Sequence, residues 1–281
     1  MNEKNVNYLK DQIKYTGFGE NLSEQLTEKI AQQLDTFSLE YQRNYDQSTM
    51  EVELYFSKSL THDMYFFNAY VVNLRGPAGK MSQTFYINKG NNITLKEAFN
   101  LMNGRAVHKR FLKRNGDPYI CWVQLDPFTT IPNGNFKLSY YHENYGFNLN
   151  STLSNYPILE MEHEEFKESI ITSLQKGNLQ LVTFEIDGKE EVKLIEANPK
   201  FKSITIYNEN REKEFWQSES STVKNVAEET QFSEEKTQEK KQAKRGEGLT
   251  KQVPKVEENA QIDSKLPQTK RNKRPRTTKK V

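Results

Sequence analysis

The sequence predicts an α+β fold with antiparallel sheets, two N-terminal helices, short covering helices and a disordered C-terminal tail. Apolar residues recur every three or four positions up to residue 34 and then alternate in residues 36–88, which marks a change from helix to strand spacing. Turn residues separate further aromatic and β-branched runs up to residue 207. Of the 32 aromatic residues, 31 precede residue 217, so the first 216 residues can bury a core.

Two helices are expected first. Residues 3–14 carry one apolar stripe, formed by Val6, Leu9 and Ile13. Gly17 and Gly19 then end the helix. Residues 21–34 begin with an Asn or Ser cap and carry a second stripe, formed by Leu22, Leu26, Ile30 and Leu34.

Four strands of an antiparallel meander are expected in residues 36–88, because polar and glycine-containing turns interrupt the aromatic runs. Thr94 and Glu97 then have the spacing of a capping box, which predicts a short helix with Leu95, Ala98, Phe99 and Met102 facing inward.

The second half of the body reads as hairpins and helices. Asn115-Gly116 joins strands 106–112 and 119–125 into a hairpin, and a third strand follows at 135–141. A helical turn is then expected at 149–153, followed by a helix at 162–176 with the stripe Phe166, Ile170, Ile171 and Leu174. The order ends with a hairpin at 179–186 and 190–196 and a strand at 200–207. We expect subdomains 1–92 and 93–216, closely packed, and a tail at 217–281.

The net charge of +2 is a sum over unlike parts. Residues 1–216 hold 24 basic and 28 acidic side chains, and residues 217–281 hold 16 and 10. Within the tail, residues 217–239 have a net charge of −4, whereas residues 240–281 carry +10. The tail is too poor in apolar residues to offset the entropy of ordering, which predicts disorder.

Several protein classes are excluded by composition. No run approaches the length of a membrane span, and the polar N-terminus has no secretory h-region, so we expect a cytoplasmic protein. The single cysteine, Cys121, lies in an apolar stretch and is expected to be buried. The four histidines are dispersed, so no metal site, and likewise no cofactor, is expected.

Catalytic residues are not evident. His142 and Glu143 begin like a zinc-protease motif, but Gly146 occupies the position of the second histidine. We interpret the pair as polar groups of a turn, with an enzyme using His142, Glu143 and Tyr145 as the least favoured alternative.

Basic residues near aromatic ones give the clearest functional pattern. Arg105, Arg110, Lys113 and Arg114 lie on or beside the first hairpin, with Tyr119 nearby. Such a set can neutralise phosphates and stack bases, although basic hairpin tips also keep sheet edges from aggregating. The tail ends in a block of seven cations without an acid: Lys270, Arg271, Lys273, Arg274, Arg276, Lys279 and Lys280. This block predicts non-specific, salt-dependent binding of DNA or RNA, or serves only as a solubilising arm.

Several segments carry a family resemblance, among them His142-Glu-Asn-Tyr-Gly-Phe147 and Glu196-Ala-Asn-Pro-Lys-Phe-Lys202. With residues 63–68, 83–90, 97–109 and 122–126, they resemble a family of hypothetical proteins from Bacteroidetes associated with conjugative transposons and other mobile elements. The hairpin 104–126 and the strands of 176–207 are also similar to a domain of unknown function that occurs beside topoisomerase-type sequences. The resemblance covers most of residues 1–207 and none of the tail. It implies a bacterial cytoplasm and proximity to DNA processing, and supplies no catalytic residues.

The favoured hypothesis is therefore a non-enzymatic accessory protein of a mobile element, tethered to DNA or RNA by a basic arm. The alternative is a module whose sheet edge or aromatic face binds another protein of the same element, with a merely solubilising tail.

Overall fold

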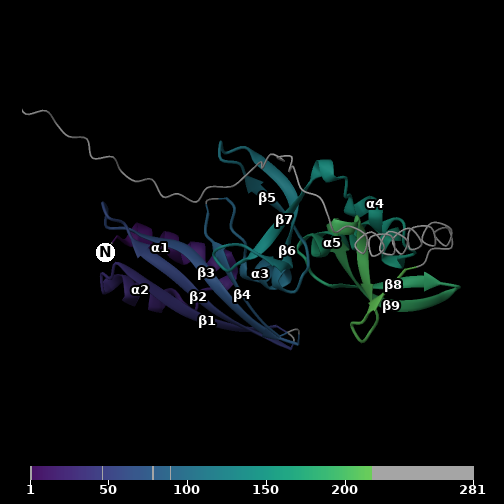
Figure 1. The fold of residues 1–281 in the computed structure, drawn as a ribbon, viewed down its shortest axis with the longest axis horizontal. Helices are drawn as coiled ribbons and strands as arrows, with labels where there is room; N and C mark the ends of the chain where they lie inside the picture. Colours follow the sequence, from purple (N-terminus) through teal and green to yellow (C-terminus); the bar gives the residue numbers. More distant parts are fainter. Residues whose placement is uncertain (1, 46, 78, 89, 217–281) are drawn as a thin grey trace, which may run out of the picture. The chain divides into compact units, whose positions relative to one another are not determined.

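The computed structural model describes residues 2–45, 47–77, 79–88 and 90–216. It confirms the α+β class, with helices and three antiparallel sheets in this part of the chain (Figure 1). The predictions for residues 217–281, including disorder and the basic block, lie outside the described residues. No helix within the described ranges is both long and apolar enough to cross a membrane.

The N-terminal helices pack on one face of a four-stranded meander. Helices α1 (Glu3–Ile13) and α2 (Ser23–Ala31) are joined through a π-helical turn at Lys14–Phe18, in which Gly17 takes a φ of 103°. The sheet has the order β1 (Thr36–Tyr45), β2 (Ser48–Lys58), β3 (Tyr65–Gly76) and β4 (Gly79–Tyr86), all antiparallel. The four predicted strands are thus confirmed.

A buried polar contact joins α1 to the sheet. The Asn5 amide donates to the Tyr65 carbonyl at 3.0 Å, and the Tyr65 N–H donates to the Asn5 side chain at 2.7 Å. Around it, the apolar stripes of both helices meet the inward residues of β1 to β4 in one core. Tyr70 is fully buried there, and its hydroxyl donates to the Ile93 carbonyl at 2.6 Å.

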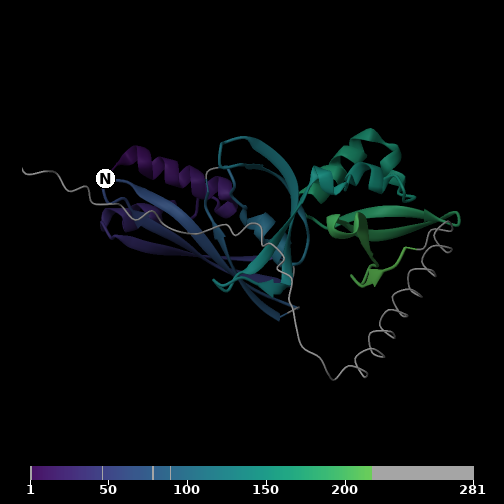
Figure 2. The ribbon, with the colours of Figure 1, turned by 45° about the horizontal axis from the view of Figure 1, so that its top comes forward.

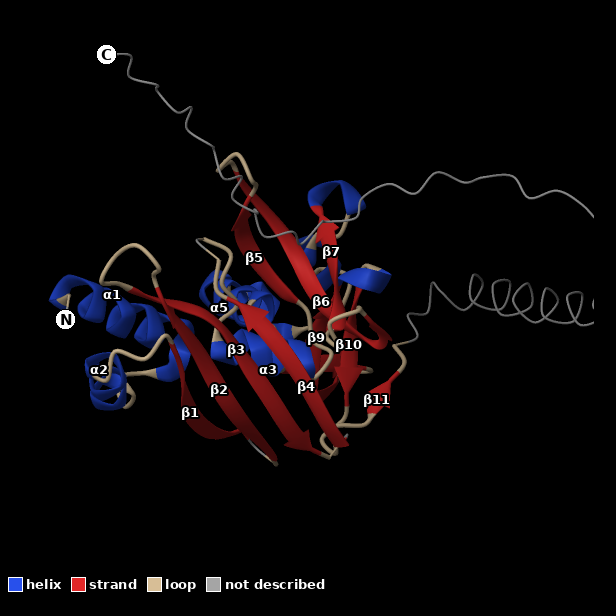
Figure 3. Cartoon of the chain, turned by 60° about the vertical axis from the view of Figure 1, so that its left-hand side comes forward, coloured by secondary structure: helices blue, strands red, loops and turns tan. Residues whose placement is uncertain are grey.

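Helix α3 (Leu95–Met102) begins with the predicted capping box of Thr94 and Glu97, and its inward residues join the same core. It leads into the three-stranded sheet β5 (Val107–Leu112), β6 (Pro118–Thr130) and β7 (Phe136–His142). No strand pairing among the described residues joins this sheet to the meander, and Figure 3 shows the strands of both in red.

The three-stranded sheet contributes to two cores because successive residues of a strand face opposite sides. Val107, Cys121 and Val123 belong to the first core. Trp122, with Ala106, belongs to a second core. The first core thus draws residues from both sides of position 92, and the expected division into 1–92 and 93–216 stays a prediction.

The second core lies between helices and a second four-stranded sheet. Its strands are β8 (Gln180–Ile186), β9 (Lys189–Asn198), β10 (Ser203–Tyr207) and the short β11 (Lys213–Glu214), in the order β11-β10-β9-β8. Helices α4 (Leu149–Leu153) and α5 (Glu164–Gln175) supply Leu153, Ile170 and Leu174 to this core. Figure 2 shows the helices of this region on one face of the green sheet.

Several predictions of detail were wrong. Leu22 is the N-cap of α2, without a side-chain cap, and the strand expected at 200–207 begins only at Ser203, after the 3-10 turn Pro199–Phe201. Helix α2 ends at Ala31, which leaves Leu34 exposed instead of in the stripe. Helix α5 begins at Glu164, because residues Leu159–Glu162 form a separate 3-10 turn in which the Glu160 carboxylate accepts the Thr183 N–H of β8. Phe166 is exposed and contacts His163 edge-on rather than joining the α5 stripe.

The buried position of Cys121 makes a chemical prediction. The side chain is buried, as expected, and burial raises the pKa of its thiol to about 11. We expect Ellman's reagent to modify Cys121 very slowly in the native protein and completely after unfolding in guanidinium. Rapid modification without denaturant would show that this strand of the core opens readily.

Candidate functional site

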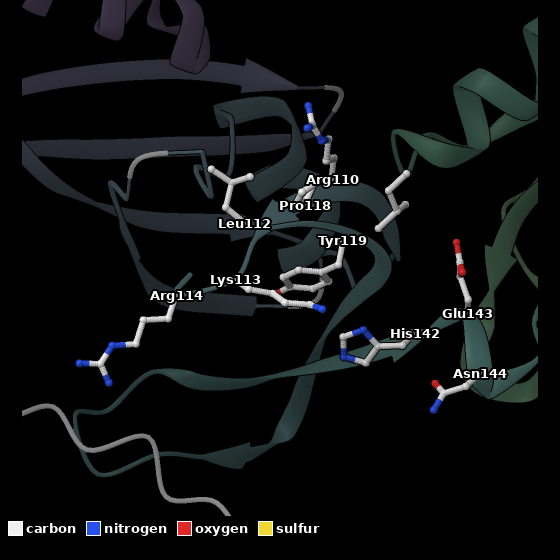
Figure 4. Close-up of a pocket in the computed structure, with 10 residues that line it drawn as sticks. Arg110, Leu112, Lys113, Arg114, Pro118, Tyr119, His142, Glu143 and Asn144 are labelled. Atoms are coloured by element: carbon white, nitrogen blue, oxygen red, sulfur yellow. The ribbon is translucent and has the colours of Figure 1, made fainter. Parts of the chain in front are cut away.

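A hollow of about 900 Å³ lies beside the β5–β6 hairpin (Figure 4). Its walls come from the hairpin, from the end of β7 and from the segment that follows β7. The residues that line it are Arg110, Leu112, Lys113, Arg114, Pro118, Tyr119, Ile120, His142, Glu143 and Asn144.

Unequal strand lengths create this hollow. Strand β6 pairs with β5 down to the Leu112–Pro118 pair, whereas β7 ends at His142 opposite Cys121. Residues 118–120 of β6 therefore have β5 on one side and no partner strand from the described residues on the other. The 3-10 turn Glu143–Tyr145 then leads the chain away, which leaves space beside Ile120.

Three cations border the hollow at the hairpin. Arg110 lies on β5, and Lys113 and Arg114 lie in the turn; all three are exposed. None of them forms an ion pair with a carboxylate of the described residues. Their charges are therefore available to an anionic ligand, and all three line the same hollow.

An aromatic pair lies in the hollow at the unpaired end of β6, on the face of the sheet opposite to Arg110. The rings of Tyr119 and His142 lie 5.5 Å apart between centroids, and Figure 4 shows them side by side. The Tyr119 ring stacks on the Phe111 ring, with 5.7 Å between the two centroids. Partial burial of Tyr119 raises the pKa of its hydroxyl. The pair thus offers a supported, partly exposed aromatic surface.

Arg105 lies apart from the hollow. Its guanidinium donates to the Asn100 side chain at 2.7 Å and lies 5.3 Å from the centroid of Phe99. It also acts on Glu196, whose pKa is raised by burial although the Tyr207 hydroxyl and Arg105 both oppose the rise. The structure therefore places Arg105 where α3 meets the four-stranded sheet β8 to β11, and not with the other three hairpin cations.

The residues of the catalytic alternative do not converge on one point. The His142 ring faces Tyr119, whereas the Glu143 carboxylate points away from that ring (Figure 4). The Tyr145 hydroxyl donates to the Lys200 carbonyl at 2.7 Å, outside the lining of the hollow. This arrangement gives no support to a reaction that uses the three together. In the described ranges, no group of His, Cys, Asp and Glu side chains is placed to hold a metal ion.

His142 is the member of the site that the sequence did not connect to the hairpin. Its position depends on the register between β6 and β7, and that register shifts between Asp126 and Thr130. An irregularity of this kind has no clear signal in a single sequence. The tail cations Lys270 to Lys280 lie outside the described residues.

Comparisons with protein-family models, with curated proteins and with solved structures found no match for this chain.

Proposed function

We propose that this protein binds single-stranded nucleic acid, without catalysing a reaction, through the hollow beside the β5–β6 hairpin. The observation that carries the proposal is that Arg110, Lys113 and Arg114 line the same open hollow as the Tyr119–His142 aromatic pair. The basic tail block would add a second, sequence-independent contact with the same polyanion.

Each part of the hollow matches a part of a nucleotide. Exposed cations attract phosphates and release their counterions, which makes binding strongly dependent on salt. An aromatic surface stacks an unpaired base, worth about 1–3 kcal/mol per base, whereas the bases of a duplex are already stacked on one another. Single strands are therefore the better ligand. The role agrees with the proximity to DNA processing that the resemblance to mobile-element proteins implies.

The direct test separates the hollow from the tail. In a tail-neutral chain, the seven cations of the block at 270–280 are replaced by glutamine in the otherwise full-length protein. Fluorescence anisotropy with labelled single strands and duplexes, at about 50 and 200 mM salt, then reports on the body alone. We expect the tail-neutral chain to retain binding of single strands and to bind duplex more weakly. Failure of this chain to bind single strands at about 50 mM salt would refute the role of the hollow.

Replacement of Glu143 is expected to strengthen binding of a single strand. Among the described residues that line the hollow, Glu143 is the only carboxylate, and it repels a phosphate placed there. Glu143→Gln in the tail-neutral chain should raise affinity for a single strand about two- to fivefold at about 50 mM salt, with a smaller gain at higher salt. Unchanged affinity at both salt concentrations would place the phosphates elsewhere.

A second function is favoured by one specific observation. Residues 118–120 of β6 present an edge beside the exposed side chain of Ile120, to which an extended segment of another protein could add a strand. A pull-down from the native host distinguishes the two functions. Nuclease treatment should abolish co-purification if nucleic acid is the ligand, and should leave it intact if a protein adds to this edge.

A further inference from the structure

A second group of cations and aromatic rings lies at the 3-10 turn Pro199–Phe201, which connects β9 to β10. Lys200, Phe201 and Lys202 are exposed there, Phe201 by 69%. The Lys200 amine lies 5.5 Å from the centroid of the Phe201 ring.

This group adjoins the hollow through the turn Glu143–Tyr145. Glu143 and Asn144 line the hollow, and the next residue, Tyr145, contacts the second group. The Tyr145 hydroxyl donates to the Lys200 carbonyl at 2.7 Å, and the Lys202 amine lies 5.0 Å from the Tyr145 ring centroid. One residue of chain therefore separates the lining of the hollow from the second group.

The backbone fixes the position of Lys202. This residue has a φ of 52°, in the left-handed region that non-glycine residues rarely adopt, and its N–H donates to the Pro199 carbonyl at 3.1 Å. Pro199 itself is buried. Pro199 and this hydrogen bond thus anchor the turn, and its two lysines and Phe201 face outward.

We propose that a bound single strand continues from the hollow across the turn Glu143–Tyr145 onto Lys200, Phe201 and Lys202. The two lysines would contact phosphates and the Phe201 ring would stack a base. This inference rests on the proposed function and extends it, because it sets the length of strand that the body accommodates and the path that the strand follows.

Two carboxylates lie near this path. The Asp126 carboxylate accepts hydrogen bonds from the Phe128 N–H at 3.0 Å and the Thr129 hydroxyl at 2.8 Å, which lower its pKa, and the Lys200 charge lowers it further. Glu143 lies in the turn between the two groups. A strand on this path would therefore bend around Glu143, with its phosphates on the lysine side.

The test compares strand lengths in the tail-neutral chain. Lys200→Gln/Lys202→Gln is compared with the control Lys4→Gln/Lys80→Gln, which alters two exposed lysines of the N-terminal half. Oligothymidylates of about 4 and about 16 nucleotides serve as ligands. We expect Lys200→Gln/Lys202→Gln to lower the affinity for the long strand about tenfold or more at about 50 mM salt. The slope of log affinity against log salt should also fall by about 1.4 for this variant. The short strand, which fits the hollow, should bind as before.

Stacking is tested separately. Phe201→Ala should weaken the long strand and leave the short one unchanged, while the control Phe166→Ala, which removes another exposed phenylalanine, should affect neither. Equal affinity of all variants for the long strand would overturn the extension and leave the hollow as the site. Failure of the tail-neutral chain to bind either length would overturn the proposed function and the extension together.

Discussion

Replacement of Arg110, Lys113 and Arg114 by glutamine in the tail-neutral chain is expected to reduce its affinity for a single strand on the order of 100-fold at about 50 mM salt. Each cation that contacts a phosphate of a single strand contributes about 0.7 to the slope of log affinity against log salt, so the slope should fall by about 2. All three side chains are exposed and form no ion pair with a described carboxylate, so the fold should be unchanged.

A matched triple variant controls for net charge. Lys4, Lys80 and Lys189 are exposed lysines on α1, β4 and β9, away from the hairpin in sequence. Their replacement by glutamine changes the total charge by the same amount and should lower affinity only slightly, because screening removes most of the effect of distant charges. Equal losses in the two triple variants would show that binding depends on total charge and not on the hollow.

The second large effect concerns stability. Asn100 is fully buried on α3, donates to the Lys176 carbonyl at 2.7 Å and to the Asn178 side chain at 3.1 Å, and accepts from Arg105 at 2.7 Å. Asn100→Ala removes all three hydrogen bonds at once. Because a buried polar group that loses its partner costs about 1–3 kcal/mol, we expect the free energy of unfolding to fall by about 3–5 kcal/mol.

Urea denaturation followed by circular dichroism measures this loss. The control is Asn44→Ala, which truncates an exposed asparagine of β1 and should change the free energy of unfolding by less than about 0.5 kcal/mol. A loss below about 1 kcal/mol for Asn100→Ala would mean that α3 and the segment at 176–178 separate without much cost.

The fold was predictable where local signals were strong. Residue spacing located α1 and the four strands of the meander, the capping box located α3, and Asn115-Gly116 located the β5–β6 hairpin. Errors arose at element ends, where tertiary contacts decide. Glu160, for example, lies just before the helix predicted at 162–176 and accepts an N–H from the edge strand β8, a contact that no local pattern indicates.

The candidate site was predictable only in part, for a physical reason. Arg110, Lys113 and Arg114 are close in sequence, so a hairpin brings them together whatever the rest of the chain does. His142 and Lys202 reach the same region through strand register and through a left-handed backbone conformation, both of which depend on packing. Arg105 is near the same hairpin in sequence, yet its hydrogen bond to Asn100 draws it to another part of the fold.

Ultraviolet cross-linking locates the bound strand on the protein. A labelled oligothymidylate is irradiated with the tail-neutral chain, and the cross-linked peptides are identified by mass spectrometry. We expect cross-links in the peptides that contain Tyr119 and His142, and we expect them to be lost when Arg110, Lys113 and Arg114 are replaced by glutamine. Cross-links confined to peptides outside the β5–β6 hairpin and the 142–145 turn would contradict binding of the strand in the hollow.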